Sequence, residues 1–259
     1  FGGRRSFNKG KYQMSVSKTE RINFVPPIFS VTINSSCNLR CPNCYYVLLG
    51  GENAFAGGGM IKVDDFKAII DKYGKYIELV SLTGGEALAH PHLDRLVDIV
   101  KRAGCKASIS TNGVFIERKI EVLKELDWVN VSLDGYDYDS FKKYRGGTPA
   151  EFDKIICGLD LLRKNNIPFG NSFVLSEENV HEVNAMLELA RTFDIERLVF
   201  ASSSAVYGEN KSDIIYETST VQPITDYGRS KREQEKVALK FYNEKKVPII
   251  IARVFNVIG

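Results

Sequence analysis

The chain has 259 residues, of which 44% are hydrophobic and 26% are charged, and its net charge is +3. These values are ordinary for a globular protein with a buried core, and the charge is too small to favour nucleic acid or an anionic membrane surface. No apolar run approaches the roughly 20 residues of a membrane-spanning helix, and no secretory signal is visible. We therefore expect neither a nucleic-acid partner nor a membrane partner.

In chain order, a basic, Gly-containing stretch without periodicity at residues 1–27 is predicted to be a flexible arm. Strand-like runs then alternate with helical patterns. Strands are predicted at 28–34, 77–83, 106–111, 128–134, 167–175, 196–204 and 247–255. Helices are predicted at 63–74, 91–104, 118–127, 149–166, 179–193 and 226–245. The helix at 91–104 starts with Pro91 and ends with Gly104, the usual asymmetry of helix ends.

This alternation predicts a parallel sheet with right-handed crossovers. The expected fold class is α/β, a partial (open) β/α barrel of about six parallel strands. Ligands bind at the carboxyl ends of the strands in such sheets. Short polar motifs that follow the strands are therefore the places to look for a functional site.

The five cysteines are an odd number, which argues against a complete disulfide framework and for a reducing, cytoplasmic compartment. Three of them, Cys37, Cys41 and Cys44, have the spacing C-x3-C-x2-C and follow the first predicted strand. Spacing alone leaves three interpretations open. These are a structural trio, a zinc site that recruits His90 or His92 as a fourth ligand, and an iron–sulfur cluster.

The stretch CNLRCPNCY, from Cys37 to Tyr45, resembles the cluster loop of the radical S-adenosylmethionine (radical SAM) superfamily. An aromatic residue often precedes the third cysteine in that family, whereas here Asn43 precedes it and Tyr45 follows it. The motifs TGGE (83–86), STNG (110–113) and VSLDG (131–135) follow the next three strands and resemble that family's cofactor segments. The resemblance covers about residues 28–194 and is strongest to molybdenum-cofactor and peptide-modifying members.

The resemblance implies a 4Fe–4S cluster on Cys37, Cys41 and Cys44, with S-adenosylmethionine bound beside it. The implied cofactor-binding residues are Gly84, Gly85, Glu86, Thr111, Asn112, Ser132, Asp134 and Asn171, with Ser172 as a further candidate beside Asn171 on the fifth predicted strand. It also implies an external electron donor and reductive cleavage of S-adenosylmethionine to a 5′-deoxyadenosyl radical. That radical removes a hydrogen atom from a small-molecule or peptide substrate that the sequence does not identify.

A second set of motifs lies further along the chain: RLVFASSSAVYG (197–208), YGRSK (227–231) and VPIIIARVFN (247–256). Together they resemble the NAD-dependent nucleotide-sugar epimerases and dehydratases, which are extended short-chain dehydrogenases. The resemblance implies Ser204, Tyr227 and Lys231 as catalytic residues, and the i, i+4 spacing places Tyr227 and Lys231 on one helix face. No G-x-G-x-x-G or G-x-x-G-x-x-G turn occurs in the sequence, so we expect no NAD and idle catalytic residues.

The chain therefore resembles a composite of a radical SAM core at 28–194 and a dehydrogenase fragment at 195–259. We expect the fragment to supply the last strands and helix, so that its first strand completes the open barrel. Two alternatives remain at this stage. One is a composite without catalytic activity, and the other is an NAD-dependent epimerase or dehydratase.

Overall fold

The computed structural model describes residues 27–50, 59–174, 178–195, 198–209, 215–246 and 248–254. Apart from residue 27, the predicted arm at 1–27 lies outside these ranges. The Gly-rich stretch after the cysteine loop and the end of the last predicted strand lie partly outside them as well. The first two thirds of the chain fold as a series of parallel β-α units.

Five strands form one sheet in the order β1-β2-β3-β4-β5, and every neighbouring pair is parallel. Their bounds are β1 Ile28–Asn34, β2 Leu79–Gly84, β3 Lys106–Thr111, β4 Trp128–Ser132 and β5 Phe169–Ser172. The order follows the chain, so each strand ends next to its predecessor. The polar motifs at the strand ends are thereby gathered along one edge of the sheet.

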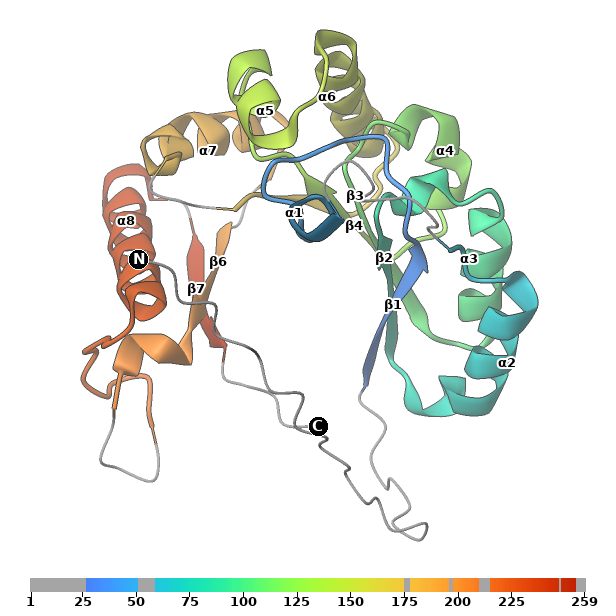
Figure 1. Cartoon of the computed structure of the whole chain (residues 1–259), viewed down its shortest axis with the longest axis horizontal. Coiled ribbons are helices and arrows are strands. Elements are labelled where there is room, and N and C mark those ends of the chain that lie inside the picture. The colour runs from blue at the N-terminus through green and yellow to red at the C-terminus, as the bar shows by residue number, and fades with distance from the viewer. Residues whose placement is uncertain are drawn as a thin grey trace, which may run out of the picture.

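Helices cover the outer side of the curved sheet, while the strands lie on the inner side of the arc (Figure 1). The α-helices of this part are α1 Tyr45–Gly50, α2 Val63–Tyr73, α3 Leu93–Arg102, α4 Ile116–Leu123, α5 Tyr138–Arg145, α6 Pro149–Lys164 and α7 Val183–Thr192. Two of these, α1 and α5, were not predicted. None of the described helices is both long and apolar enough to cross a membrane.

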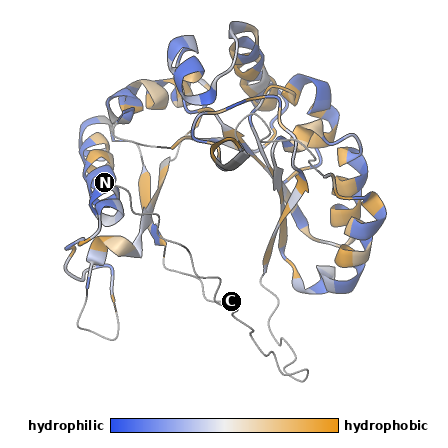
Figure 2. Ribbon diagram, viewed as in Figure 1, coloured by the Kyte–Doolittle hydropathy of each residue, from blue (hydrophilic) through white to orange (hydrophobic). Residues whose placement is uncertain are grey.

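The main core lies between the sheet and these helices. In α3, the residues Leu93, Leu96, Val97 and Val100 are buried at the i, i+3, i+4 and i+7 positions of one face. They belong to the same cluster as the outward-facing residues of the central strands, such as Val80. Figure 2 shows the result as helices that are apolar toward the sheet and hydrophilic toward the outside.

The last part of the chain forms a second β-α-β unit. It consists of β6 Leu198–Ser203, the short helix η5 Ser204–Tyr207, α8 Asp226–Lys245 and β7 Ile249–Val254. β6 and β7 pair in parallel as a separate two-stranded sheet. The unit packs on α7, where Val183 and Leu187 form a small apolar cluster with Phe241 of α8.

The prediction of one sheet of about six strands is therefore not confirmed. Among the described residues β6 has no ladder with β5, and a cavity of about 1120 Å³ separates them. Aromatic side chains from both sides line this cavity, including Phe173 and Phe200. The reason is that β6 is held by its own unit: it pairs with β7 over six residues and is tied to α8 by a buried polar network.

That network centres on Glu235 of α8, which is 1% exposed. Its carboxylate accepts hydrogen bonds from Ser202 Oγ at 2.6 Å and from Arg253 Nε and Nη2 at 2.8 and 2.9 Å. Arg253 in turn donates to the hydroxyl of Tyr207 at 2.8 Å. Burial acts to raise the pKa of Glu235, but hydrogen bonds from Arg253 and Ser202 outweigh it and hold that pKa below its ordinary value. The network joins β6, η5, α8 and β7.

We expect Glu235→Ala to destabilise this unit by about 3 kcal/mol, because it removes the carboxylate that binds Ser202 and the partly buried guanidinium of Arg253. Helix loss in urea is followed by circular dichroism, to which α8 contributes the longest described helix. In the variant, part of the dichroism should be lost at a lower urea concentration than in the wild type. The difference in unfolding free energy between the wild type and the variant should shrink as the pH falls through the folded-state pKa of Glu235. That pKa is lowered because the network stabilises the ionised carboxylate, and protonation removes this stabilisation.

The matched control is Glu233→Ala, whose ion pair with Lys236 is well exposed and should contribute no more than about 1 kcal/mol. Equal unfolding curves for the Glu235 and Glu233 variants would show that the buried network does not hold the unit together.

Candidate cluster and cofactor site

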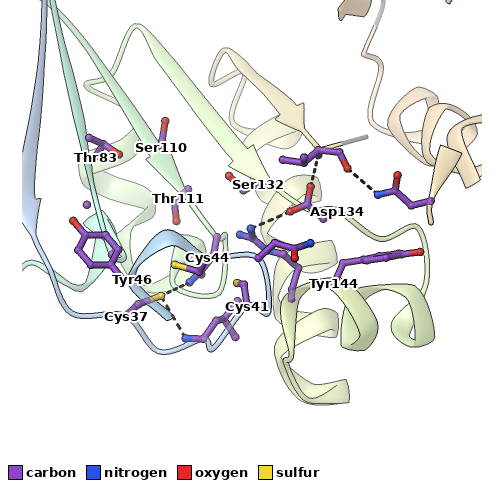
Figure 3. Close-up of a pocket in the computed structure, with 18 residues that line it drawn as sticks. Cys37, Cys41, Cys44, Tyr46, Thr83, Ser110, Thr111, Ser132, Asp134 and Tyr144 are labelled. Carbon is purple, nitrogen blue, oxygen red and sulfur yellow. Dashed lines mark hydrogen bonds and ion pairs between the residues drawn. The ribbon is translucent and has the colours of Figure 1, made fainter. Parts of the chain in front are cut away.

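A cavity of about 270 Å³ lies at the carboxyl ends of the strands. Its walls bring together the cysteine loop, the ends of β2, β3 and β4, and the end of α5 (Figure 3). The lining residues that the sequence predicted are Cys37, Cys41, Cys44, Gly84, Gly85, Thr111, Asn112, Ser132 and Asp134. Segments more than 100 residues apart in the sequence, such as those of Cys37 and Arg145, thus meet around one space, as parallel strand order requires.

The cysteine loop is fixed to the end of β2 by the two glycines of TGGE. Gly84 has a φ of +154°, and a Cβ there would lie 2.1 Å from the carbonyl oxygen of Asn34. A Cβ at Gly85 would lie 2.4 Å from the carbonyl oxygen of Ser36. Backbone hydrogen bonds join the same segments, from Gly85 N to Asn34 O at 2.7 Å and from Glu86 N to Ser36 O at 2.8 Å. The glycines therefore hold the chain that leads directly into Cys37.

Glu86 does not line the cavity, although the sequence predicted a carboxylate close to the cofactor. It is 1% exposed and accepts hydrogen bonds from Thr111 Oγ1 at 2.6 Å, Asn112 N at 2.7 Å and Leu88 N at 2.8 Å. Burial raises its pKa, and these three donors act in the opposite direction. The structure makes Glu86 a clamp between the ends of β2 and β3, with its oxygen atoms already engaged.

The three cluster cysteines are free thiols that are partly buried. Burial raises the pKa of Cys41 to about 11, although the nearby Arg145 acts to lower it. Burial likewise raises the pKa of Cys37, against hydrogen bonds from Leu39 N and Asn112. Thiols of this kind become thiolates when a metal replaces their protons. The donor set thus fits a metal group rather than a free nucleophile.

Within the described residues, no three His, Cys, Asp or Glu side chains are placed to hold a single metal ion. A cubane cluster does not need such convergence, because each thiolate binds a different iron. The two nitrogens of His90 are engaged with Ile61 O and with His92 N, and neither histidine lines the cavity. These observations favour a cluster over the zinc site that the spacing left open.

Arg145 is the cation that the sequence analysis missed. It ends α5 and is the only positively charged side chain among the described residues lining the cavity. Its Nη1 donates to Asp134 Oδ2 at 3.0 Å, whereas its buried Nε has no hydrogen-bond partner among the described residues. Asp134 also accepts from Val174 N at 2.7 Å, and burial raises its pKa, against the effects of Arg145 and Val174.

A sequence signal for α5 did exist. Asp137 caps the helix through a capping box with Ser140, and Gly146 ends it with a φ of +71°. Phe141 and Tyr144 form the buried stripe between those ends. An Asp cap, a Gly stop and this spacing together predict a short helix, which would have brought Arg145 to the edge where the strands end.

Asn171 is a second predicted cofactor residue that lies outside the cluster cavity. It lies on β5 opposite Val131, which is fully buried, and it lines the larger cavity between β5 and β6 rather than the cluster cavity. Its neighbour Ser172 lies opposite Ser132, with the two hydroxyl oxygens 3.5 Å apart. Side chains alternate along a strand, so Ser172, not Asn171, shares the face that carries Ser132.

The dehydrogenase-like residues also lie away from the cluster cavity. Lys231 Nζ donates to Ala201 O at 2.8 Å and lies 5.7 Å from the ring centre of Tyr227, whose side chain is exposed. Ser204 begins η5, and among the described residues no hydrogen bond joins it to Tyr227 or Lys231. The structure thus brings the Tyr–Lys pair together, as the i, i+4 spacing predicts, without completing a triad.

Comparison with family models divides the chain in two. The model described as the radical SAM superfamily matches residues 31–190. The model described as the NAD dependent epimerase/dehydratase family matches residues 171–259 and overlaps the first over 171–190. These matches support the composite organisation that the motifs predict.

Two of the curated relatives show the extent of the similarity. The AdoMet-dependent heme synthase of Methanosarcina barkeri is 27% identical over 170 residues, which are 64% of this chain and 47% of the relative. The GTP 3′,8-cyclase of Chlorobaculum tepidum is 31% identical over 183 residues, 68% of this chain and 54% of the relative. The chain therefore spans about half the length of these relatives.

The fold is shared with a solved structure, Streptococcus suis SuiB bound to S-adenosylmethionine. The TM-score is 0.64, with 16% sequence identity, over 88% of this chain and 50% of that chain. At this identity the similarity concerns the fold. Because the radical SAM model covers more than half of the chain and its motifs meet around one cavity, this protein belongs to the radical SAM superfamily of enzymes.

Proposed function

We propose that this chain is a radical SAM catalytic core that holds a 4Fe–4S cluster on Cys37, Cys41 and Cys44 and binds S-adenosylmethionine beside it. The observation that carries the proposal is the single cavity shared by these thiols and the polar ends of β2, β3 and β4. When bound, the cluster and cofactor supply an electron and a 5′-deoxyadenosyl radical, which abstracts hydrogen from a substrate. The protein's residues bind, orient and shield these groups.

The three thiols suit a cluster with one open iron. A 4Fe–4S cube normally takes four thiolates, and the remaining two cysteines of the chain are not available as a fourth ligand of the proposed cluster. Cys105 is buried and donates to the carbonyls of Gly74 and Ile77, while Cys157 is exposed on α6. An iron without a cysteine ligand leaves room for the cofactor to coordinate.

The cavity also suits the other groups of S-adenosylmethionine. The guanidinium of Arg145 is the proposed partner of the methionine carboxylate, since its fork geometry matches a carboxylate and its Nε has no partner within the part of the chain that the structure describes. The backbone of Gly84 and Gly85 is the proposed surface for the ammonium group. The hydroxyl of Ser132 is the proposed partner of the ribose, because Thr111 Oγ1 already donates to Glu86 and accepts from Gly113 N.

We propose the boundaries 28–194 for the radical SAM core and 195–259 for the dehydrogenase-like part. The second part contributes packing on α7 rather than chemistry: Tyr227 is exposed, and the sequence has no Gly-rich turn to present a nicotinamide to it. The names of the two relatives, a heme synthase and a GTP 3′,8-cyclase, favour a small-molecule substrate. An external donor supplies the electron.

Anaerobic reconstitution with iron and sulfide tests the cluster. We expect Cys41→Ala to lose the visible absorption of the cluster and most of its iron, because a thiolate that binds one iron is removed. Cys105→Ala is the matched control and should keep the iron content of the wild type, since its thiol bonds only to backbone carbonyls. Equal iron content in the Cys41 variant and the wild type would refute the proposed ligand set and favour a composite without catalytic activity.

Binding and cleavage of S-adenosylmethionine test the second half of the proposal. Arg145→Met should weaken binding about 10- to 100-fold, the loss of about 1.5–3 kcal/mol that a hydrogen bond to a charged group supplies. Arg145→Lys keeps the charge but not the fork geometry, so its affinity should lie between those of the wild type and Arg145→Met. Calorimetry measures the affinity, and chromatography of 5′-deoxyadenosine measures cleavage under dithionite.

Tyr227→Phe serves as the control and should change neither affinity nor cleavage, because Tyr227 lies outside the cavity. A reconstituted wild type that releases no 5′-deoxyadenosine above a cluster-free sample would count against the proposed reaction. Saturable binding of NADH that is lost in Lys231→Ala would show that the dehydrogenase-like part has a nicotinamide site and does more than pack on α7.

A further inference from the structure

We propose that Asn112 is a positioning residue, which donates a hydrogen bond to the sulfur of Cys37 and thereby sets the electron affinity of the cluster. This inference rests on the proposed function, in which Cys37 is a cluster ligand. It concerns a side chain whose sequence motif indicated only a contact to the cofactor. Hydrogen bonds of both its side chain and its backbone fix the position of Asn112 beside Cys37.

The side-chain amide of Asn112 links the end of β3 to the cysteine loop. Its Nδ2 lies 3.7 Å from Cys37 Sγ and 2.8 Å from Asn38 Oδ1. The backbone N–H of Leu39 lies 3.4 Å from the same sulfur, and dashed lines mark the bonds at this sulfur in Figure 3. Within the described part of the chain, Cys37 is the only one of the three cluster thiols with such donors on its sulfur.

The orientation of the amide is fixed by its other end. Asn112 Oδ1 accepts a hydrogen bond from Val114 N at 3.1 Å. Turning the amide over would leave this buried N–H without an acceptor and would place the amide oxygen against Asn38 Oδ1. Because both changes are unfavourable, the NH₂ group must face Cys37, with one hydrogen for Asn38 Oδ1 and one for the sulfur.

The backbone of Asn112 is held as firmly as its side chain. Its N–H donates to Glu86 Oε2 at 2.7 Å, and the preceding Thr111 donates to the other oxygen of the same carboxylate. The following Gly113 turns the chain with a φ of +86°, and a Cβ there would lie 3.0 Å from Val131 Cγ1. Asn112 is 5% exposed, so water does not compete strongly for its amide.

A donor at this place acts differently on the two oxidation states of a cluster. Reduction adds negative charge, part of which falls on the ligand sulfurs, and the amide hydrogen stabilises that charge. Hydrogen bonds to sulfur are among the factors that set iron–sulfur potentials, and their effect is larger in a dry site. Asn112 should therefore favour the reduced cluster, the state that must be reached before an electron can be delivered.

The test compares reconstituted wild type with Asn112→Ala, Asn112→Asp and Asn38→Ala. The readout is the midpoint potential of the cluster, from a dithionite titration followed by electron paramagnetic resonance without S-adenosylmethionine. We expect a more negative potential in Asn112→Ala, which lacks the donor, and a still more negative one in Asn112→Asp, which puts a carboxylate at the sulfur. Asn38→Ala should keep the wild-type potential, because it loses a hydrogen bond to the same amide but leaves the donor to Cys37 in place.

Iron content and thermal unfolding are measured on the same samples. If Asn112→Ala does not fold, Asn112→Asp carries the comparison, since its oxygen still accepts from Val114 N. Equal potentials in the wild type and a folded Asn112 variant would overturn the inference while leaving the proposed function intact. A wild type that takes up no iron would overturn the proposed function, and this inference with it.

Discussion

The buried carboxylate of Glu86 is the interaction on which the cluster site depends. It follows β2 and binds Thr111 and Asn112 at the end of β3, while its own backbone N–H and carbonyl bind Ser36 and Asn34 ahead of the cysteine loop. Three segments are thereby locked to one another through a single residue. A charged group is buried only where its hydrogen bonds are satisfied, and here that requirement fixes the geometry of the cavity.

The dehydrogenase-like part is also held together by a buried, hydrogen-bonded carboxylate, that of Glu235. A carboxylate that is 1% exposed joins Ser202, Arg253 and Arg232 from β6, β7 and α8. A β-α-β unit with such an internal network keeps its own strand pairing. This explains why β6 continues the curve of the arc in Figure 1 without joining the ladder of β5. The contact between the two parts is made by apolar side chains of α7 and α8 instead.

The electrostatics of the cluster cavity follow from its burial. Burial raises the pKa values of the Cys37 and Cys41 thiols, so a bound metal group would supply the positive charge that stabilises their thiolates. Arg145 forms an ion pair with Asp134, and its Nε has no hydrogen-bond partner in the described ranges. The cavity therefore combines a polarisable sulfur side with a fixed cation, an arrangement suited to a metal cluster beside a carboxylate-bearing ligand.

The sequence by itself determined the β-α alternation and the strands from Ile28 to Thr111, because hydrophobic periodicity is a local property. It also indicated that the three cysteines gather with Thr111 and Ser132, because successive β-α units almost always form a parallel sheet with right-handed crossovers. Only the tertiary structure decided where individual side chains point. Glu86 is a clamp because β3 lies beside it, and Asn171 lies outside the cluster cavity because its strand β5 borders the larger cavity instead. The separation of β6 from β5 is likewise decided by long-range packing, since a strand pattern specifies that a segment will pair but not which partner will bind it most strongly.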